Sequence, residues 1–299
     1  MFGRIAAALF VLVCASSTNA QDPSRPVETT PTHEDWYDTC EDWDEWDKPG
    51  PPYKVFGNTY YVGTCGIAAI LIAGNEGHVL IDSGTEGGAE IVARNIEQLG
   101  FRLQDVKLIL HSHEHHDHIG GLEKLRKLTG AHVVTSKAAR KTVETGQVSS
   151  EDPQFATHEP MTPTQVERAI EGGDFVGGGD LELEAIATPG HTPGALSWFW
   201  TSCEGAVCLR IVYADSLSPV SSDTYRFTDH PSYLEKYRTG LKKLASVECE
   251  ILLTPHPSAS AMRKRSVSTL GLLGEDLCRD YAASIEARLD ARLAKEASE

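Results

Sequence analysis

Five of the chain's 12 histidines fall within eight residues, between His111 and His118. The run reads His-Ser-His-Glu-His-His-Asp-His, so it combines imidazole groups with a carboxylate, and these are ligands that suit Zn²⁺. A flexible histidine-rich tract that binds metal incidentally would have polar flanks. Here the apolar stretch Leu108–Leu110 precedes the run and Gly120-Gly121 follows it. We therefore predict a metal site on a loop at the end of a buried strand.

Two further histidines have a similar setting. His191 lies in a Thr-Pro-Gly-His-Thr-Pro-Gly segment and His256 in a Thr-Pro-His-Pro segment, each after an apolar stretch. A single loop histidine is more often just a surface residue, but two in rigid turns after strands favour metal ligands. The other histidines outside the run lack this setting, and we assign a structural role to His33, His78, His132, His158 and His230.

Short apolar or alternating stretches predict strands that are interleaved with helices. Strands are expected at 59–62, 68–73, 79–81, 106–110, 133–134, 181–187 and 251–253, with a hairpin over 195–213. Helices are expected at 89–99, 122–128, 234–244 and 277–293. The weakly periodic residues 145–180 suit a mobile loop beside a site. Two successive mixed halves, roughly 51–200 and 201–299, predict an α/β protein with two packed sheets and outer helices.

Residues 1–20 have the features of a secretory signal peptide. Arg4 precedes the short apolar run Ile5–Val13, and Thr18-Asn19-Ala20 offers small residues at the usual cleavage spacing. The run is too short to span a membrane, and Cys14 lacks the small preceding residue of a lipid anchor. We therefore expect export without a membrane anchor. Residues 21–50, rich in Pro and acidic residues, predict an irregular N-terminal arm.

Six cysteines remain after the predicted cleavage, and export would expose them to an oxidising compartment, so disulfides are expected. Spacing favours a Cys203–Cys208 bond across the hairpin, while six cysteines allow 15 pairings in all. The net charge is −16, and removal of the signal, which holds one Arg and no acid, gives −16 − 1 = −17. Such a surface disfavours nucleic acid and anionic membranes as partners.

The pattern His113-x-His115-x-Asp117-His118, followed by His191 and His256, resembles the metallo-β-lactamase superfamily. Three segments are similar to its subclass B3, namely 57–64, 213–218 and 254–258, and the resemblance covers nearly all of residues 50–299. It implies an αβ/βα sandwich of two mixed β-sheets with helices on the outer faces and the site at one edge of the sheets.

The resemblance also implies roles for individual residues. The first zinc ion would be held by His113, His115 and His191. The second would be held by Asp117, His118 and His256, with Asp117 also orienting the nucleophile.

Residues around these ligands also receive roles from the resemblance. Ser216 and Ser218 would bind a substrate carboxylate, and Asp82 and Asp215 would orient the ligands from behind. The implied disulfides are Cys249–Cys278, Cys40–Cys65 and Cys203–Cys208. Weaker candidates for contact with substrate are Arg226, Phe155 and Tyr225, while His111 and His116 are not required by the pattern.

The implied function is hydrolysis of the β-lactam amide bond of penicillins, cephalosporins and carbapenems by a hydroxide bound to two Zn²⁺ ions. The expected enzyme is a periplasmic monomer that confers antibiotic resistance. The chain has no G-x-S-x-G segment, which weighs against a serine hydrolase. Two alternatives stay open: a thioesterase or lactonase with the same metal site, and a non-catalytic zinc-binding protein that would not need Asp117.

Overall fold

The computed structural model describes residues 30–158 and 160–298, so the predicted signal peptide lies outside the described residues. Two β-sheets form its centre. The first sheet has seven strands in sequential order. They are β1 (Tyr53–Phe56), β2 (Thr59–Tyr61), β3 (Ile70–Ile72), β4 (His78–Ile81), β5 (Val106–Leu110), β6 (His132–Ser136) and β7 (Arg168–Ile170). The strands from β1 to β4 are antiparallel, and those from β4 to β7 are parallel.

The second sheet has five strands in the order β12-β11-β10-β9-β8. Their bounds are β8 (Phe175–Gly178), β9 (Leu181–Ala187), β10 (Leu196–Glu204), β11 (Val207–Tyr213) and β12 (Ile251–Leu253). Only the pair β11 and β12 is parallel, so these two strands end at the same edge of the sheet.

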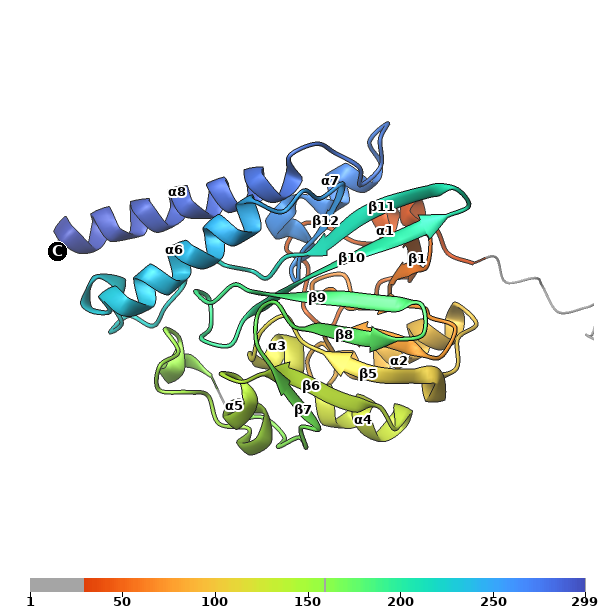
Figure 1. Cartoon of the computed structure of the whole chain (residues 1–299), viewed down its shortest axis with the longest axis horizontal. Coiled ribbons are helices and arrows are strands. Elements are labelled where there is room, and N and C mark those ends of the chain that lie inside the picture. Colours follow the sequence, from red (N-terminus) through yellow and green to blue (C-terminus); the bar gives the residue numbers. More distant parts are fainter. Residues whose placement is uncertain (1–29, 159, 299) are drawn as a thin grey trace, which may run out of the picture.

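Helices pack around the two sheets. They are α1 (His33–Thr39), α2 (Gly88–Gln98), α3 (His116–Ile119), α4 (Leu122–Thr129), α5 (Arg140–Thr145), α6 (Pro231–Ala245), α7 (Met262–Ser266) and α8 (Leu277–Ser298), with short 3₁₀ turns η1 (Leu103–Asp105), η2 (Phe155–Thr157), η3 (Phe227–Asp229) and η4 (Pro257–Ser260). Helices α6 and α8 lie side by side against the second sheet, and α2 and α4 lie on the far side of the first (Figure 1). Among the described helices, none has the length and apolar character needed to cross a bilayer.

Three apolar clusters hold these layers together. One lies between the sheets and contains the fully buried Trp198 and Tyr213. A second joins the first sheet to α2 and α4, and a third joins the second sheet to α6 and α8. This arrangement confirms the predicted sandwich of two mixed sheets with outer helices.

The structure corrects three details of the sequence prediction. The division between the sheets falls between β7 and β8 instead of near residue 200, because β9 pairs with β10 and β10 pairs with β11. Residues 145–180 contain β7 and β8 in place of one continuous loop. The arm expected to be irregular contains α1, which begins at a capping box between Thr32 and Asp35.

Three disulfides join the pairs Cys40–Cys65, Cys203–Cys208 and Cys249–Cys278. The first attaches the end of α1 to the segment after β2. The second spans the β10–β11 hairpin, where the two cysteines are directly opposite each other. The third links the start of β12 to α8, so it fixes the last helix to the second sheet.

Candidate metal centre

The loops that carry the predicted ligands meet at one edge of the two sheets. The histidine run leaves the parallel strand β5, the His191 turn joins β9 to β10, and the His256 turn leaves β12. The sheets are joined beside the site, because the Leu196 backbone N–H donates to the Ser112 carbonyl at 2.7 Å. The indole of Trp198 donates to the carbonyl of His111 at 2.9 Å from the same strand. Strand pairing therefore brings residues that are far apart in sequence to one place.

His113, His115 and His191 form the first ligand cluster, in which the three ligand atoms lie within 4.8 Å of one another. Each histidine has one ring nitrogen occupied by a partner outside the cluster. His113 Nδ1 lies 2.7 Å from Asp215 Oδ1, His115 Nε2 lies 3.0 Å from Asp152 Oδ2, and His191 Nδ1 donates to the Ser218 carbonyl at 3.0 Å. The other nitrogen of each ring is left for the cluster, as in metal-binding histidines.

Asp117, His118 and His256 meet in a second cluster. Asp117 Oδ2 lies 3.0 Å from His118 Nε2 and 3.3 Å from His256 Nε2. The ligand atoms of His113, Asp117 and His118 also lie within 4.8 Å of one another, so His113 connects the two clusters. All six predicted ligands are therefore close together.

The protonation states of the first cluster and of Asp117 suit cation binding. Burial would lower the pKa of His118, but Asp117 outweighs it and raises that pKa to about 10, so His118 would lose a proton on binding a metal. Burial lowers the pKa of His115 and of His191 to about 3, and it holds the pKa of His113 well below its ordinary value. These rings are therefore neutral at pH 7, as metal ligands must be. Burial alone would raise the pKa of Asp117, but His118 and His256 outweigh it and hold that pKa well below its usual range.

A metal ion fits the residues present. His113 is fully buried, and its Nε2 has no hydrogen-bond partner among the described residues, while its Nδ1 is paired with Asp215. A buried imidazole nitrogen without a partner costs about 1–3 kcal/mol. A cation coordinated by Nε2 would satisfy that nitrogen. The donor set of histidines with one carboxylate is that of zinc.

The family model of the metallo-β-lactamase superfamily matches residues 62–256 of the sequence. The chain belongs to the metallo-β-lactamase superfamily. It is 57% identical to the MIM-2 metallo-β-lactamase, with a TM-score of 0.85, over 89% of this chain and 98% of that chain. It is 40% identical to MEM-A1, a subclass B3 metallo-β-lactamase from a soil metagenome library, with a TM-score of 0.81, over 85% of this chain and 99% of that chain.

A more distant relative is the hydroxyacylglutathione hydrolase of Rhodospirillum rubrum. It is 28% identical over 120 residues, which are 40% of this chain and 38% of that protein. These likenesses confirm the predicted superfamily and the resemblance to subclass B3, and they identify the chain as a hydrolase. The superfamily depends on metal ions, typically zinc, in agreement with the ligand clusters.

Asp82 and Asp215, which the sequence analysis expected to orient the ligands, each contact one of the predicted ligand histidines of this metallo-β-lactamase fold. Both are fully buried. Asp82 Oδ2 lies 3.3 Å from His118 Nδ1 and accepts hydrogen bonds from the Ser112 and Tyr213 hydroxyls, each at 2.7 Å. Asp82 has a φ of +66°, a left-handed conformation, at the turn after β4. Hydrogen bonds to its carboxylate help to hold that turn in place.

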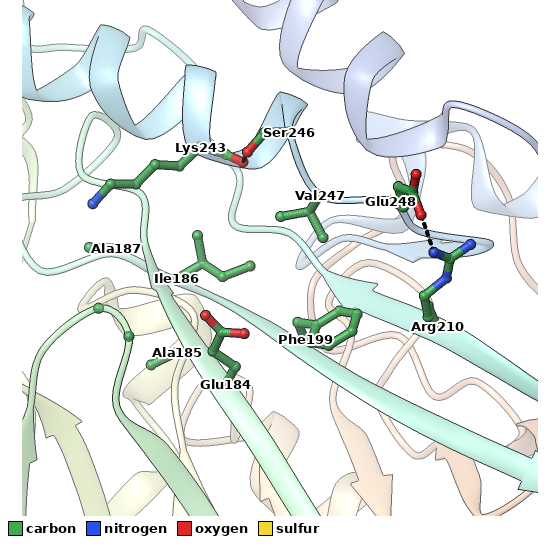
Figure 2. A pocket seen from close by; sticks show the side chains of 12 residues that line it. Glu184, Ala185, Ile186, Ala187, Phe199, Arg210, Lys243, Ser246, Val247 and Glu248 are labelled. Atoms are coloured by element: carbon green, nitrogen blue, oxygen red, sulfur yellow. Dashed lines mark hydrogen bonds and ion pairs between the residues drawn. The ribbon is translucent and has the colours of Figure 1, made fainter.

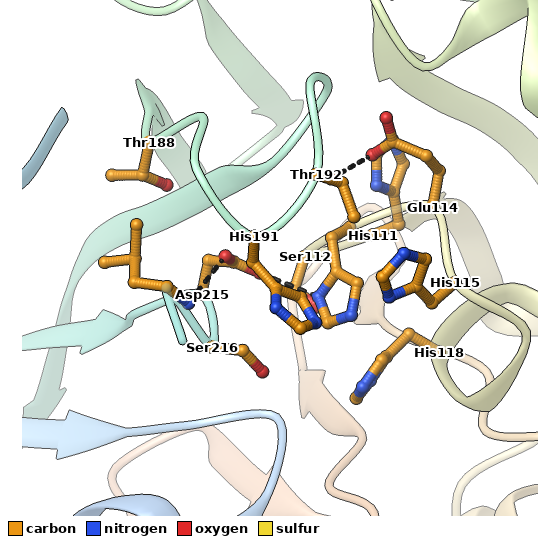
Figure 3. A network of polar contacts seen from close by, with 12 residues as sticks. His111, Ser112, Glu114, His115, His118, Thr188, His191, Thr192, Asp215 and Ser216 are labelled. Carbon is orange, nitrogen blue, oxygen red and sulfur yellow. Dashed lines mark hydrogen bonds and ion pairs between the residues drawn. The ribbon is translucent and has the colours of Figure 1, made fainter. Parts of the chain in front are cut away.

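Glu114, which the sequence analysis did not single out, connects two ligand loops. It lies between His113 and His115, and only 1% of it is exposed. Its carboxyl group accepts from the Thr192 hydroxyl at 2.6 Å and from the Gly194 N–H at 2.8 Å, on either side of Pro193 (Figure 3). Burial raises the pKa of Glu114 to about 7. Its place inside the histidine run was a signal for a role in the site.

Three more residues near the ligands were missed. Asp152 contacts His115, but it lies in a weakly periodic segment that gives no sequence signal. His158, assigned a structural role, stacks on the His115 ring with centroids 4.0 Å apart. Trp46 of the N-terminal arm is 42% exposed, and its ring centroid lies 5.2 Å from that of His116. Only tertiary packing brings these side chains to the site.

The residues predicted to contact substrate differ in whether their side chains already have a hydrogen-bond partner. Ser216 is buried, and its hydroxyl has no hydrogen-bond partner among the described residues, while the Ser218 hydroxyl lies 3.1 Å from His191 Nδ1. Arg226 donates to the carbonyl of Glu296 in α8, so its guanidinium group already has a partner.

The remaining candidates are the two aromatic residues and the two histidines that the pattern does not require. Phe155 is 51% exposed, and Tyr225 stacks on His230. His111 is buried beside Thr135, with which its Nε2 forms a 2.5 Å hydrogen bond, and His116 faces Trp46.

Cavities with the size of small-molecule sites lie at two places along the described residues. One, of about 580 Å³, borders Gly120 and His116, the neighbour of Asp117 in the sequence. The other, of about 500 Å³, lies on the outer face of the second sheet between Phe199 and the end of α6 near Lys243 (Figure 2). No histidine or cysteine is among the described residues that line the second cavity, so it is separate from the metal centre.

Proposed function

We propose that this hydrolase opens the β-lactam amide bond of penicillins, cephalosporins and carbapenems with the help of two zinc ions. The observation that carries the proposal is the meeting of the six predicted ligands from three loops at one edge of the sandwich. His113, His115 and His191 would hold the first ion, and Asp117, His118 and His256 the second. The similarity to MIM-2 and MEM-A1 supports the β-lactam substrate.

Bound zinc would supply a Lewis acid and a water molecule that loses a proton near neutral pH. The protein's part is to hold ligands and substrate in fixed positions. Asp117 would orient the attacking oxygen, because its Oδ2 lies between His118 and His256 in the second cluster. Asp215 and Asp82 would keep His113 and His118 in one ring orientation.

Ser216 and Ser218 would bind the carboxylate of the substrate. Ser216 is the stronger candidate, since its hydroxyl has no partner among the described residues. The Ser218 hydroxyl is close to His191, so substrate binding there would compete with that contact. We further propose that the protein is exported to the periplasm, acts as a monomer and confers antibiotic resistance.

A thioesterase is the second candidate, because a hydroxyacylglutathione hydrolase is among the relatives. The position of Asp215 favours the lactamase. The resemblance to the superfamily implies that a thioesterase would use an aspartate at this place to bridge two metals. Here Asp215 Oδ1 faces His113 Nδ1 at 2.7 Å, and Oδ2 accepts the Leu217 N–H at 3.0 Å. Both oxygens have partners, and Oδ1 contacts the ring nitrogen of His113 that is not left for a metal, which supports an orienting role.

The test is to measure hydrolysis of nitrocefin and of a glutathione thioester by the zinc-loaded protein, with and without a chelator. The proposal expects chelator-sensitive hydrolysis of nitrocefin with a kcat/KM well above that for the thioester. A higher kcat/KM for the thioester would favour the second candidate. Zinc binding without turnover of either substrate would favour a non-catalytic zinc-binding protein.

A further inference from the structure

Asp152 is a buried carboxylate outside the predicted ligand set. Only 1% of the residue is exposed, and it lies in the turn that follows α5. Its two oxygens have different partners. Oδ2 lies 3.0 Å from His115 Nε2, and Oδ1 accepts the Gln154 N–H at 2.7 Å. One oxygen therefore contacts a metal-ligand candidate while the other closes the turn.

The turn that carries Asp152 is held in place on both sides. The Asp152 N–H donates to the Ser149 carbonyl and the Phe155 N–H donates to the Asp152 carbonyl, each at 3.0 Å. The Pro153 carbonyl accepts the Ser222 N–H at 2.9 Å, so the turn is also joined to the loop after β11. Since that loop begins at Asp215 and Ser216, two loops around the centre are connected through this bond.

We propose that Asp152 is a positioning residue of the first metal site, an inference that rests on the proposed zinc function. A carboxylate that accepts a hydrogen bond from the far nitrogen of a ligand histidine fixes its tautomer and makes the coordinating nitrogen more basic. Asp152 Oδ2 does this for His115, which directs His115 Nδ1 toward His113 and His191. The orientation of His115 then depends on the 149–155 turn and on its bond to Ser222.

A purely structural role for Asp152 makes a different prediction. If only the bond from Oδ1 to the Gln154 N–H mattered, a serine at position 152 would retain most of the effect, because its hydroxyl can accept the same bond. Serine is too short to reach His115 as well. D152S therefore keeps the turn and removes the contact with the ligand. Asparagine has only one acceptor oxygen, so D152N can keep the contact with His115 or the bond from the Gln154 N–H, but not both.

The experiment compares the zinc affinities of the full-length parent, D152S, D152N and E151Q by competition with a chromogenic chelator. E151Q is the matched control, because Glu151 is the exposed neighbour in the same turn. We expect D152S to weaken zinc binding by about 10–100-fold, D152N to weaken it less, and E151Q to match the parent. The visible absorption of the Co²⁺-substituted proteins should change for D152S and stay unchanged for E151Q.

Equal zinc affinity and equal Co²⁺ spectra for D152S and the parent would overturn the proposal. Its failure is distinguishable from that of the proposed function. A parent that binds zinc but does not hydrolyse nitrocefin would contradict the lactamase activity, and the affinity comparison would still decide the role of Asp152. A parent that binds no zinc would overturn both.

Discussion

At the residue scale, one oxygen of Asp117 faces imidazoles from two loops, His118 at 3.0 Å and His256 at 3.3 Å. The position requires an anion, because its neighbours are histidines and the expected ligand is a cation. An amide would keep the shape of the side chain and lose its charge. The chemistry of the site should therefore respond to this change far more than the fold.

We expect D117N to lower kcat/KM for nitrocefin by ~10²–10⁴-fold, the range for loss of a positioned catalytic group. The metal-free protein should also lose some stability, because the lowered pKa of Asp117 means that its charge stabilises the fold at pH 7. D38N, at an exposed position in α1, is the matched control and should retain the parent rate. A rate for D117N within threefold of the parent would contradict the assigned role.

Glu114 acts on the same site by linking the histidine run to the His191 turn. E114A should lower the free energy of unfolding by about 2–4 kcal/mol, since it leaves a cavity and two buried donors without acceptors. E114Q should cost less than about 1 kcal/mol, because its carbonyl accepts the Gly194 N–H and its amide donates to the Thr192 hydroxyl. Urea unfolding measures both values, and equal losses in the two variants would show that the hydrogen bonds are not the cause.

At the element scale, α8 holds the short helix η3 through one buried side chain. Glu296 is 2% exposed and accepts the N–H groups of Phe227 and Thr228, at 3.1 and 2.9 Å. Arg292 donates to the same carboxylate at 2.7 Å. Burial alone would raise the pKa of Glu296, but these hydrogen bonds outweigh it and lower that pKa below 4.5.

The lowered pKa of Glu296 determines the direction in which the stability of the fold changes with pH. A carboxylate with a lowered folded-state pKa adds stability that is fully present above its unfolded-state pKa and is lost as the pH falls through the folded-state pKa. The parent should exceed E296Q in unfolding free energy by about 1–3 kcal/mol at pH 7, and this difference should shrink near pH 3. Urea unfolding at both pH values tests this, with the exposed E275Q as control. A difference independent of pH would contradict the assignment.

At the scale of the whole molecule, the ligands come from both sheets, so metal binding should stabilise the entire sandwich. Strand β5 belongs to the first sheet, while β9 and β12 belong to the second. An ion that binds only where these strands are correctly packed binds the folded state alone. Its binding free energy therefore adds to the stability of the fold.

We expect removal of zinc by a chelator to abolish nitrocefin hydrolysis and to lower the melting temperature. At a free zinc concentration 100 times Kd, each site adds about 2.7 kcal/mol, so the decrease should exceed ~5 °C. Added zinc should restore both rate and melting temperature. In D117N the shift should be smaller, because the second site lacks its carboxylate. An unchanged melting temperature in the parent would mean that the cation does not link the sheets.

Much of the fold could be predicted from local patterns. The helix periodicity over 89–99 and the stop at Gly100 match α2, and the hairpin around Glu204-Gly205 matches β10 and β11. The predicted division between the sheets, near residue 200, lies C-terminal to the observed one between β7 and β8. The residue pattern of β9 and β10 predicts strands but does not identify their pairing partners. Residues 145–180 gave no period because β7 and β8 are only three and four residues long and β8 contains two glycines.

The sequence by itself determined the chemistry of this protein. Histidines and an aspartate after an apolar strand, with two more histidines in rigid turns, predicted a metal site, and the resemblance to the metallo-β-lactamase superfamily predicted which residues bind each ion. These are local features, and they are visible along the chain. The tertiary structure decided which side chains orient those ligands. Asp152 and Glu114, which the sequence analysis did not single out, contact His115 and the His191 turn from 37 and 80 residues away. Contacts of that span arise only when the sheets pair and pack, so no local pattern encodes them.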